Sequence, residues 1–372
     1  MIKVMVVFGT RPEAIKMCPV VNELKRRKNI RVFTCISGQH KELLNSVINI
    51  FSVKADYNLK IMKDRQTLFD ITERVLERIK RVLLEVEPDI VLVHGDTSTA
   101  FAVSLACFYM KIPVGHIEAG LRSGDVFEPY PEEFNRRSIS IISKYDFAPT
   151  TCAAENLYRE GKSKKFVYIT GNTVIDALQT TIKENYSHPL IDWIGNKRSI
   201  LVTAHRRENI GQPMVSIFKD VRRLADERRD IRIICPLHSN PDVRDVAREF
   251  LDGAINVKLC GPLEVIDFHN ILAKVSFVAT DSGGLQEEGI ALGKPVLVLR
   301  NKTERTEGVL SGGIKLIGTC EGDVCHNLKM LLDDNDLYKK MSCSPNPYGD
   351  GKASKRIADI IEKELLGLTF VK

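Results

Sequence analysis

Short apolar, β-branched runs recur along the chain, and each is followed by a turn and then by a stretch with helical spacing. This alternation of strand and helix predicts an α/β fold of parallel, doubly wound sheets with helices on both faces. One sheet holding every run would be unusually wide, so two Rossmann-like domains are the simpler interpretation. The runs read KVMVVF, RVFTCI, DIVLVH, PVGHI and KFVYIT in the first half and SILVTA, RIIC, SFVAT and PVLVL in the second.

A polar, proline-containing stretch, NYSHPLIDWIGNKRS, interrupts this alternation near the middle of the chain. It predicts a domain boundary, and we place an N-terminal domain at residues 1–171 and a second domain at residues 172–352. The apolar spacing after Ala353 predicts a terminal helix within residues 353–372, which can pack back on the N-terminal domain. A chain of 372 residues is long enough to bury two such cores.

The composition argues against nucleic-acid and membrane partners. The formal net charge is +6, and the basic residues are interleaved with acidic ones, which suits a small anionic ligand better than a nucleic-acid surface. No apolar stretch approaches the roughly 18 residues of a membrane span, and the first apolar run is too short for a signal peptide. We therefore expect a cytoplasmic protein.

The residues that follow the strands carry most of the chemistry, because ligands of doubly wound sheets bind outside the carboxyl ends of the strands. Polar side chains follow nearly every predicted strand of both halves. If the strand ends of the two domains face each other, these turns meet in one cleft. In chain order they read GTRPE, SGQH, GDTST, EAGLR, HRREN, LHSNP, DSGG and RNKTER.

Two of these turns have the form of a phosphate site at a helix start. In DSGGLQEE, Gly283 and Gly284 permit close backbone approach where free N–H groups and the helix dipole can hold a phosphate. Glu288 follows about one helical turn later, where it can accept hydrogen bonds from a ribose. In GTRPEAIK, Arg11 can clamp a diphosphate and Lys16 can add a point charge. A plain glycine turn and solvated helix-start charges are the alternatives.

Three further turns have both a ligand-binding and a structural interpretation. Asp96 in VHGDTST can face a ligand or cap the next helix. His205, followed by Arg206 and Arg207, favours an anion site. His238 in LHSNP is the weaker candidate, since the following Asn and Pro explain that turn as helix initiation.

Several cofactor and catalytic classes lack their motifs. There is no G-x-G-x-x-G and no P-loop motif, so neither a nicotinamide cofactor nor a P-loop nucleotide is indicated. The nine cysteines lack the spacing of a zinc or redox motif, and H-E-x-x-H is absent, so no metal is expected. No G-x-S-x-G is present, and Ser282 has no adjacent base in sequence.

The ordered combination GTRPE, VHGDT, HIEAGLRSGD, PYPEEFNR, HRREN and DSGGLQEE resembles the non-hydrolysing UDP-N-acetylglucosamine 2-epimerases across nearly the full chain. The resemblance implies the two-domain architecture of GT-B glycosyltransferases, an active site in the interdomain cleft, a UDP-sugar substrate, no cofactor and usually a homodimer. It also implies a microbial pathway of capsule, teichoic acid or lipopolysaccharide-type glycan synthesis.

Site residues carry over from the family by position. Asp96, Glu118 and Glu132 match its catalytic carboxylates, and His205 matches a fourth residue tied to turnover. Some members bind a second UDP-N-acetylglucosamine as activator, and Gln39, Gln66, Arg206 and His238 match parts of that pocket. Glu42 departs from the glutamine that those members carry. The family's UDP-binding positions correspond to Arg11, Lys16, His205, Phe268, Ser282, Gly283, Gly284, Glu288 and Arg305.

The implied reaction inverts C2 of the sugar by eliminating UDP to 2-acetamidoglucal and adding UDP back, with a proton returned to the opposite face of C2. The leaving diphosphate needs fixed cations and helix N-termini, the electron-poor ring needs nearby carboxylates, and C2 needs a general base and a general acid. Which of the three carboxylates does which job is open from the residues.

Within the stretch from His116 to Arg137, Glu118 lies at a strand end and Glu132 at a helix start. The remaining acids, Asp125, Glu128 and Glu133, are expected in solvent. Arg122 and Arg136 either orient the two carboxylates or balance their charge. Alternative functions are a hydrolysing epimerase, an epimerase of a related UDP-diacetamido sugar, a GT-B glycosyltransferase and a non-catalytic nucleotide-sugar sensor.

Overall fold

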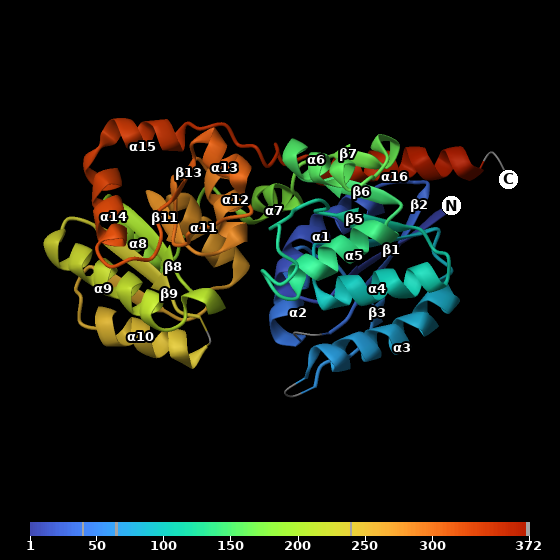
Figure 1. The fold of residues 1–372 in the computed structure, drawn as a ribbon, viewed down its shortest axis with the longest axis horizontal. Helices are drawn as coiled ribbons and strands as arrows, with labels where there is room; N and C mark the ends of the chain where they lie inside the picture. The colour runs from blue at the N-terminus through green and yellow to red at the C-terminus, as the bar shows by residue number, and fades with distance from the viewer. Residues whose placement is uncertain (39–40, 64–65, 239, 370–372) are drawn as a thin grey trace. The chain divides into compact units, whose positions relative to one another are not determined.

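The chain divides into two compact units in the computed structural model (Figure 1). Unit 1 comprises Met1–Thr180 and Tyr348–Lys372, and unit 2 comprises Thr181–Pro347. The residues that the structure describes are 1–38, 41–63, 66–238 and 240–369.

The division between the units differs from the boundary that the sequence suggested after residue 171. Helix α7 (Thr173–Thr181) lies almost entirely in unit 1. Its buried Asp176 accepts the backbone N–H groups of Ala353 (3.1 Å) and Ser354 (2.7 Å). The chain therefore returns to unit 1 just before its last helix, and this long-range contact has no signal in the local sequence.

Unit 1 is built on a parallel sheet with the strand order β3-β2-β1-β4-β5-β6-β7, as far as its described residues show. Strand β1 is apolar except for Lys3. It pairs with β2 from Ile2 to Phe8 and with β4 from Val4 to Val6. Such runs are typical of parallel strands covered on both faces. The strands are β1 (Ile2–Phe8), β2 (Ile30–Ile36), β3 (Tyr57–Asn58), β4 (Ile90–His94), β5 (Val114–Ile117), β6 (Tyr145–Ala148) and β7 (Val167–Ile169).

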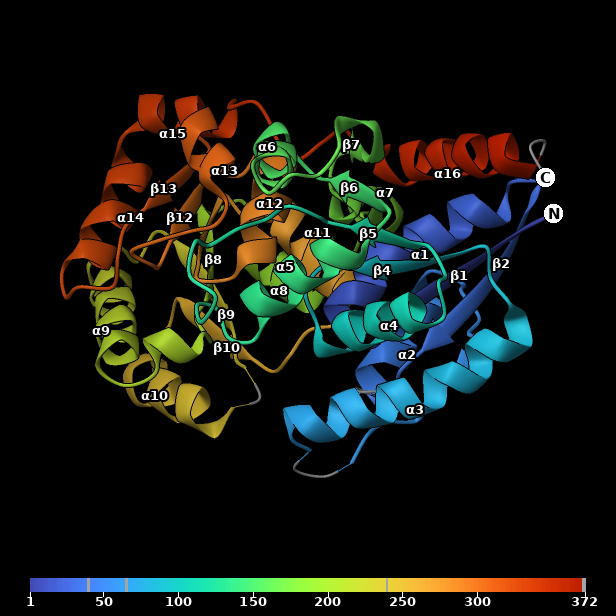
Figure 2. The same cartoon turned by 45° about the vertical axis from the view of Figure 1, so that its right-hand side comes forward.

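Helices cover both faces of this sheet. Met5 and Val7 of β1 join a core that includes buried residues of α3, α4 and α5, while α1 packs with α2 and with the C-terminal helix α16. In Figures 1 and 2, α3 and α4 lie side by side. Besides α7, the helices are α1 (Arg11–Lys25), α2 (Lys41–Ile50), α3 (Leu68–Val86), α4 (Ser98–Tyr109), α5 (Glu132–Ile142), α6 (Thr151–Arg159), the 3₁₀ turn η1 (Lys164–Phe166) and α16 (Ala353–Thr369).

Unit 2 repeats the plan with a parallel sheet of order β10-β9-β8-β11-β12-β13 among its described residues. One core joins the sheet to α9, α10, α14 and α15, and a second joins it to α8, α11 and α12. The strands are β8 (Ser199–Thr203), β9 (Arg232–Pro236), β10 (Val257–Cys260), β11 (Phe277–Thr280), β12 (Val296–Val298) and β13 (Ile314–Leu316). The helices are α8 (Pro189–Ile194), η2 (Arg207–Asn209), α9 (Gln212–Glu227), α10 (Pro241–Leu251), α11 (Val265–Lys274), α12 (Gly283–Ala291), α13 (Thr306–Ser311), α14 (Asp323–Asp333) and α15 (Asn335–Ser342).

The predicted α/β class with two doubly wound sheets is confirmed, but four short strands were missed: β3, β6, β10 and β13. Strand β6 reads YDFA and contains the fully buried Asp146, which pairs with Lys162 at 2.9 Å. A strand of four residues with an acid inside it gives no apolar run to detect. None of the helices in the described ranges has the length and apolar character that crossing a bilayer requires.

Candidate functional site in two parts

Glu118 is the most tightly held of the predicted carboxylates of unit 1. It follows β5 directly, with a left-handed backbone (φ 63°) that costs a non-glycine residue about 1–3 kcal/mol. Its Oε2 accepts hydrogen bonds from Lys16 and from Asn172 Nδ2 at 2.7 Å, and His94 Nε2 lies 3.5 Å away. Strained backbone and converging polar groups are typical of a functional position.

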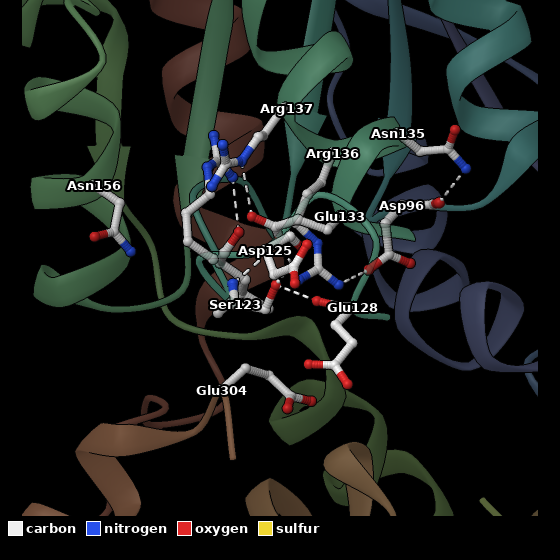
Figure 3. A network of polar contacts seen from close by, with 12 residues as sticks. Asp96, Ser123, Asp125, Glu128, Glu133, Asn135, Arg136, Arg137, Asn156 and Glu304 are labelled. Atoms are coloured by element: carbon white, nitrogen blue, oxygen red, sulfur yellow. Dashed lines mark hydrogen bonds and ion pairs between the residues drawn. The ribbon is translucent and has the colours of Figure 1, made fainter. Parts of the chain in front are cut away.

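Asp96 belongs to a second buried network, which Figure 3 shows in close view. Arg136 joins the Asp96 carboxylate to Glu133, and Asn135 Nδ2 donates to the Asp96 backbone carbonyl at 2.9 Å. Glu133 also accepts from Ser123 N at 3.1 Å. Its side chain is fully buried, so the expectation of a solvated Glu133 is wrong, and Arg136 orients Asp96 and also balances its charge.

Glu132 begins α5, after the cis peptide bonds Glu128–Pro129 and Tyr130–Pro131. Its Oε2 is buried and has no hydrogen-bond partner among the described residues. An unpaired buried carboxylate oxygen is costly, and such atoms often mark the place of a ligand or a proton. Asp125 and Glu128, on the same excursion, are exposed as expected.

Arg122 lies apart from the carboxylates that it was expected to orient or balance. It forms a two-pronged pair with Glu160 at 2.7 and 2.6 Å and donates to Ser140. This arginine therefore links the end of α6 to α5 and does not contact the predicted catalytic carboxylates in these hydrogen bonds.

The turn after β1 is closed by Glu13, a residue that sequence reasoning passed over. Glu13 Oε2 accepts the N–H groups of Gly9 (2.9 Å) and Thr10 (2.8 Å), and its Oε1 accepts from Thr97 at 2.7 Å. A Cβ on Gly9 would lie 2.1 Å from Ser37 Oγ, so a larger residue there would force the Ser37 side chain to move. The capping box spacing T-x-x-E was the available signal. Arg11 begins α1 beside this turn.

Two further polar residues that the sequence did not single out support the unit 1 carboxylates. Asn172, beside α7, donates to Glu118, and His116 Nε2 donates to the Gly95 carbonyl at 2.7 Å, next to Asp96. Burial lowers the pKa of His116 to about 3, so its ring is neutral. His116 lies inside β5 rather than after it, and Asn172 lies in the turn between β7 and α7, which carries none of the motifs singled out from the sequence.

In unit 2, Ser282 and the two glycines that follow it start α12 immediately after β11. A Cβ on Gly283 would lie 2.8 Å from Glu304 Oε1, whereas one on Gly284 would meet no atom closer than 4.0 Å. Glu288 lies one turn along α12, and its Oε1 is 3.8 Å from His269 Nε2. The half-buried Phe268 contacts the ring of His269.

Arg305 is buried within a charged network beside Gly283. It donates to Glu287 Oε1 at 2.8 Å and to Glu304 Oε1 at 2.9 Å. Burial works against ionisation of Glu304, but the guanidinium groups of Arg305, Arg300 and Arg206 outweigh it and hold the pKa of Glu304 at about 2. Arg305, predicted as a UDP contact, thus neutralises two buried acids at the start of α12.

His205 follows β8 in a turn that Asp281 organises. The fully buried Asp281 accepts from His205 N, Arg206 N and Asn209 Nδ2, each at 2.9 Å. The His205 ring is stacked on that of His238, with centroids 5.2 Å apart and an interplanar angle of 9°.

Of the four residues assigned to a second ligand, the structure describes three. Gln39 lies outside the described residues. The Oε1 atom of Gln66 is buried and has no partner in the described part of the chain. Arg206 and His238 flank the His205 turn within unit 2. The described residues contain no group of three or more His, Cys, Asp or Glu side chains that could hold a metal ion.

Two doubly wound α/β units, one with carboxylates and one with a glycine-rich helix start behind their strands, have the architecture of a GT-B-like enzyme. The chain belongs to the UDP-N-acetylglucosamine 2-epimerase family, whose model matches residues 22–362. It is 52% identical to the UDP-N-acetylglucosamine 2-epimerase of Bacillus subtilis, covering 96% of this chain and 94% of that protein.

Solved structures give the same result for the fold. The UDP-GlcNAc 2-epimerase of Neisseria meningitidis bound to UDP-GlcNAc has a TM-score of 0.93 and 44% identity, over 97% of this chain and 100% of that one. The S. aureus MnaA–UDP co-structure has a TM-score of 0.93 and 48% identity, over 98% and 97% of the two chains.

Proposed function

We propose that this protein is a non-hydrolysing UDP-N-acetylglucosamine 2-epimerase, an isomerase that reversibly interconverts UDP-GlcNAc and UDP-ManNAc. The observation that carries the proposal is the set of three carboxylates of unit 1, two after strands and one at the start of α5. Glu118 is held by a lysine and an amide, Asp96 by an arginine, and Glu132 has an unpaired buried oxygen. Three acids in three different environments suit a reaction that needs a base, an acid and stabilisation of positive charge.

The reaction breaks the C1–O bond to UDP and removes the proton on C2, which leaves 2-acetamidoglucal. The bond electrons go to the diphosphate, and the C2–H electron pair forms the double bond. Re-addition of UDP, with a proton delivered to the opposite face of C2, gives the epimer. One of the three carboxylates takes the C2 proton in the elimination, and because the substrate and the product have the same oxidation level, no redox cofactor is required.

Unit 2 supplies the groups that suit the nucleotide. The free N–H groups at the N-terminus of α12 can bind the diphosphate. Glu288 can accept hydrogen bonds from the ribose, and Phe268 can lie against the uracil. Arg11 of unit 1 suits the diphosphate as well. Gln66, Arg206 and His238 are the candidates for a second nucleotide sugar.

Proton exchange at C2 tests the proposal. The protein is incubated with UDP-GlcNAc in heavy water, with EDTA and without NAD, and C2 is followed by NMR. We expect UDP-ManNAc with deuterium at C2. Free N-acetylmannosamine with UDP as the main product would favour the hydrolysing reaction instead, and absence of any exchange at C2 would refute an epimerase. UDP-diacetamido sugars under the same conditions test the substrate.

We further propose that the protein is a homodimer that works in the cytoplasm, where nucleotide sugars serve cell-surface polysaccharide synthesis. Large apolar side chains are exposed on three adjacent helices of unit 1. The rings of Phe101 on α4 and Phe134 on α5 touch, with centroids 5.6 Å apart. Exposed apolar patches of this kind mark association surfaces. The exposed members are Phe69, Leu84, Phe108, Tyr109, Phe134 and Ile141.

A further inference from the structure

We propose that Asp281 is a positioning residue that holds a proton on Nδ1 of His205 and so directs the Nε2–H of that ring to the departing diphosphate. The inference rests on the proposed function and deepens it by assigning a role to a carboxylate outside the set in unit 1. Every residue in the argument belongs to unit 2.

The two oxygens of Asp281 have different surroundings. Its Oδ2 accepts three hydrogen bonds of 2.9 Å, from His205 N, Arg206 N and Asn209 Nδ2. Its Oδ1 is buried and has no hydrogen-bond partner among the described residues. The Nδ1 atom of His205 lies 3.5 Å from Oδ1. Catalytic hydrogen bonds are often this long before a ligand binds, and they shorten in the complex.

The orientation of the His205 ring is fixed from a second side. The ring lies parallel to that of His238. His238 Nδ1 accepts the backbone N–H of Asn240 at 3.1 Å, so the proton of the neutral His238 ring is on Nε2. Burial, followed by the neighbouring His205, lowers the pKa of His238. The stacked partner therefore favours its neutral form, in which Nε2 carries the proton.

The geometry gives His205 a defined chemical role. A carboxylate at Nδ1 requires a hydrogen on that nitrogen, and Nε2 lies on the opposite side of the ring. When the C1–O bond breaks, its electron pair moves to the diphosphate oxygen, and a hydrogen bond from Nε2–H stabilises the new charge. Carboxylates that orient a histidine in this way are a recurring feature of enzyme sites.

The alternative is that Asp281 only closes the turn through Oδ2. Asp281→Asn separates the two roles, because the amide oxygen can still accept the three N–H groups while the amide NH₂ replaces Oδ1. An NH₂ group cannot accept the hydrogen on Nδ1. We expect D281N to keep its melting temperature within a few degrees and its KM within about threefold, and to lose kcat by about 100-fold or more.

A double-mutant cycle with His205→Asn tests whether Asp281 acts through His205. The double variant D281N/H205N should have a kcat no lower than that of H205N alone. A kcat loss in the double variant equal to the product of the two single losses would overturn the proposal. Asn209→Ala is the matched control, because Asn209 touches Oδ2 but not the His205 ring. We expect N209A to be less stable with most of kcat retained. A kcat loss in N209A equal to that of D281N would assign the effect to the turn.

One measurement is made on the wild-type protein and does not depend on turnover. In wild-type protein labelled with ¹⁵N-histidine and saturated with UDP, we expect His205 Nδ1 to carry a proton, with H205N used only to assign the signal. A ring in the complex that bears its single proton on Nε2 would overturn the proposal. If the protein fails to exchange C2 but Nδ1 is protonated, the proposed function fails while the positioning of the His205 ring by Asp281 stands.

Discussion

Lys16 and Glu118 form an ion pair in which the side chains are only 10% and 8% exposed. Lys16 was assigned to the nucleotide by resemblance, yet the group that it contacts is a predicted catalytic carboxylate. The first helix of the chain therefore helps to hold a residue that lies 102 positions further along the chain.

We expect Lys16→Met to act through Glu118. Removing one partner of a buried ion pair leaves an uncompensated charge, which costs on the order of 3 kcal/mol. K16M should melt at lower temperature and lose kcat by more than it loses affinity for UDP. The double variant K16M/E118Q should regain most of the stability, since no buried charge is left unpaired. A K16M variant that loses UDP affinity in proportion to kcat would contradict this role.

The three carboxylates are expected to affect turnover rather than nucleotide binding. Asp96→Asn, Glu118→Gln and Glu132→Gln should each lower kcat by roughly 100-fold to 10,000-fold, the range of a lost proton-transfer group. The Kd for UDP, measured by calorimetry, should change by less than about fivefold. The control is Glu128→Gln, an exposed acid on the same excursion as Glu132, which should retain wild-type turnover.

Acid sensitivity of unit 2 should depend on Glu304. A carboxyl whose pKa is lowered on folding stabilises the protein fully above its ordinary pKa, and that stabilisation is lost as the pH falls. Here the window runs from 4.5 down to about 2, and the contribution is on the order of 3 kcal/mol. Glu304→Gln should therefore lose less stability between pH 6 and pH 3 than wild type, measured by thermal melting.

Glu249→Gln is the control for the Glu304 prediction, because Glu249 is an exposed acid of the same unit. Its pH dependence should match that of wild type. Identical pH profiles for E304Q and wild type would contradict a stabilising role for the buried Glu304 carboxylate.

The two glycines at the start of α12 should differ in their tolerance of alanine. A Cβ at 283 would lie 2.8 Å from Glu304 Oε1, while a Cβ at 284 has no atom closer than 4.0 Å. Gly283→Ala should therefore destabilise unit 2 by about 1–3 kcal/mol, with a lower melting temperature. Gly284→Ala should melt at or above the wild-type temperature, because alanine favours the helix. Equal melting temperatures for the two variants would show that the Glu304 side chain can move away from the added Cβ without loss of stability.

The exposed apolar side chains on α3, α4 and α5 predict the oligomeric state. Phe108 and Ile141 are 59% and 84% exposed, and a buried charge at either position of a dimer interface would be costly. Phe108→Glu and Ile141→Glu should sediment as monomers. Leu310→Glu, on unit 2 and 86% exposed in this structure, should keep the wild-type mass. Unchanged sedimentation of all three variants would place the interface elsewhere.

The strand and turn pattern predicted the fold class, and the turns predicted where polar groups collect, because both depend on residues close together in the sequence. Glu118, Asp96 and Ser282 follow strands as expected. The missing strands were too short or too polar to form an apolar run. The burial of Glu133, which was expected in solvent, could not be predicted, since adjacent helical positions differ in direction by about 100° and only packing decides which one faces the core.

The sequence by itself determined the two α/β units, the helix starts and the set of reactive side chains behind the strands. The tertiary structure decided which of these groups touch each other: Lys16 on Glu118, Arg136 between Asp96 and Glu133, and Asp281 beneath His205. The reason is physical. Backbone propensity and periodicity act over a few residues, whereas charge pairing and burial depend on contacts between segments that are distant in the chain.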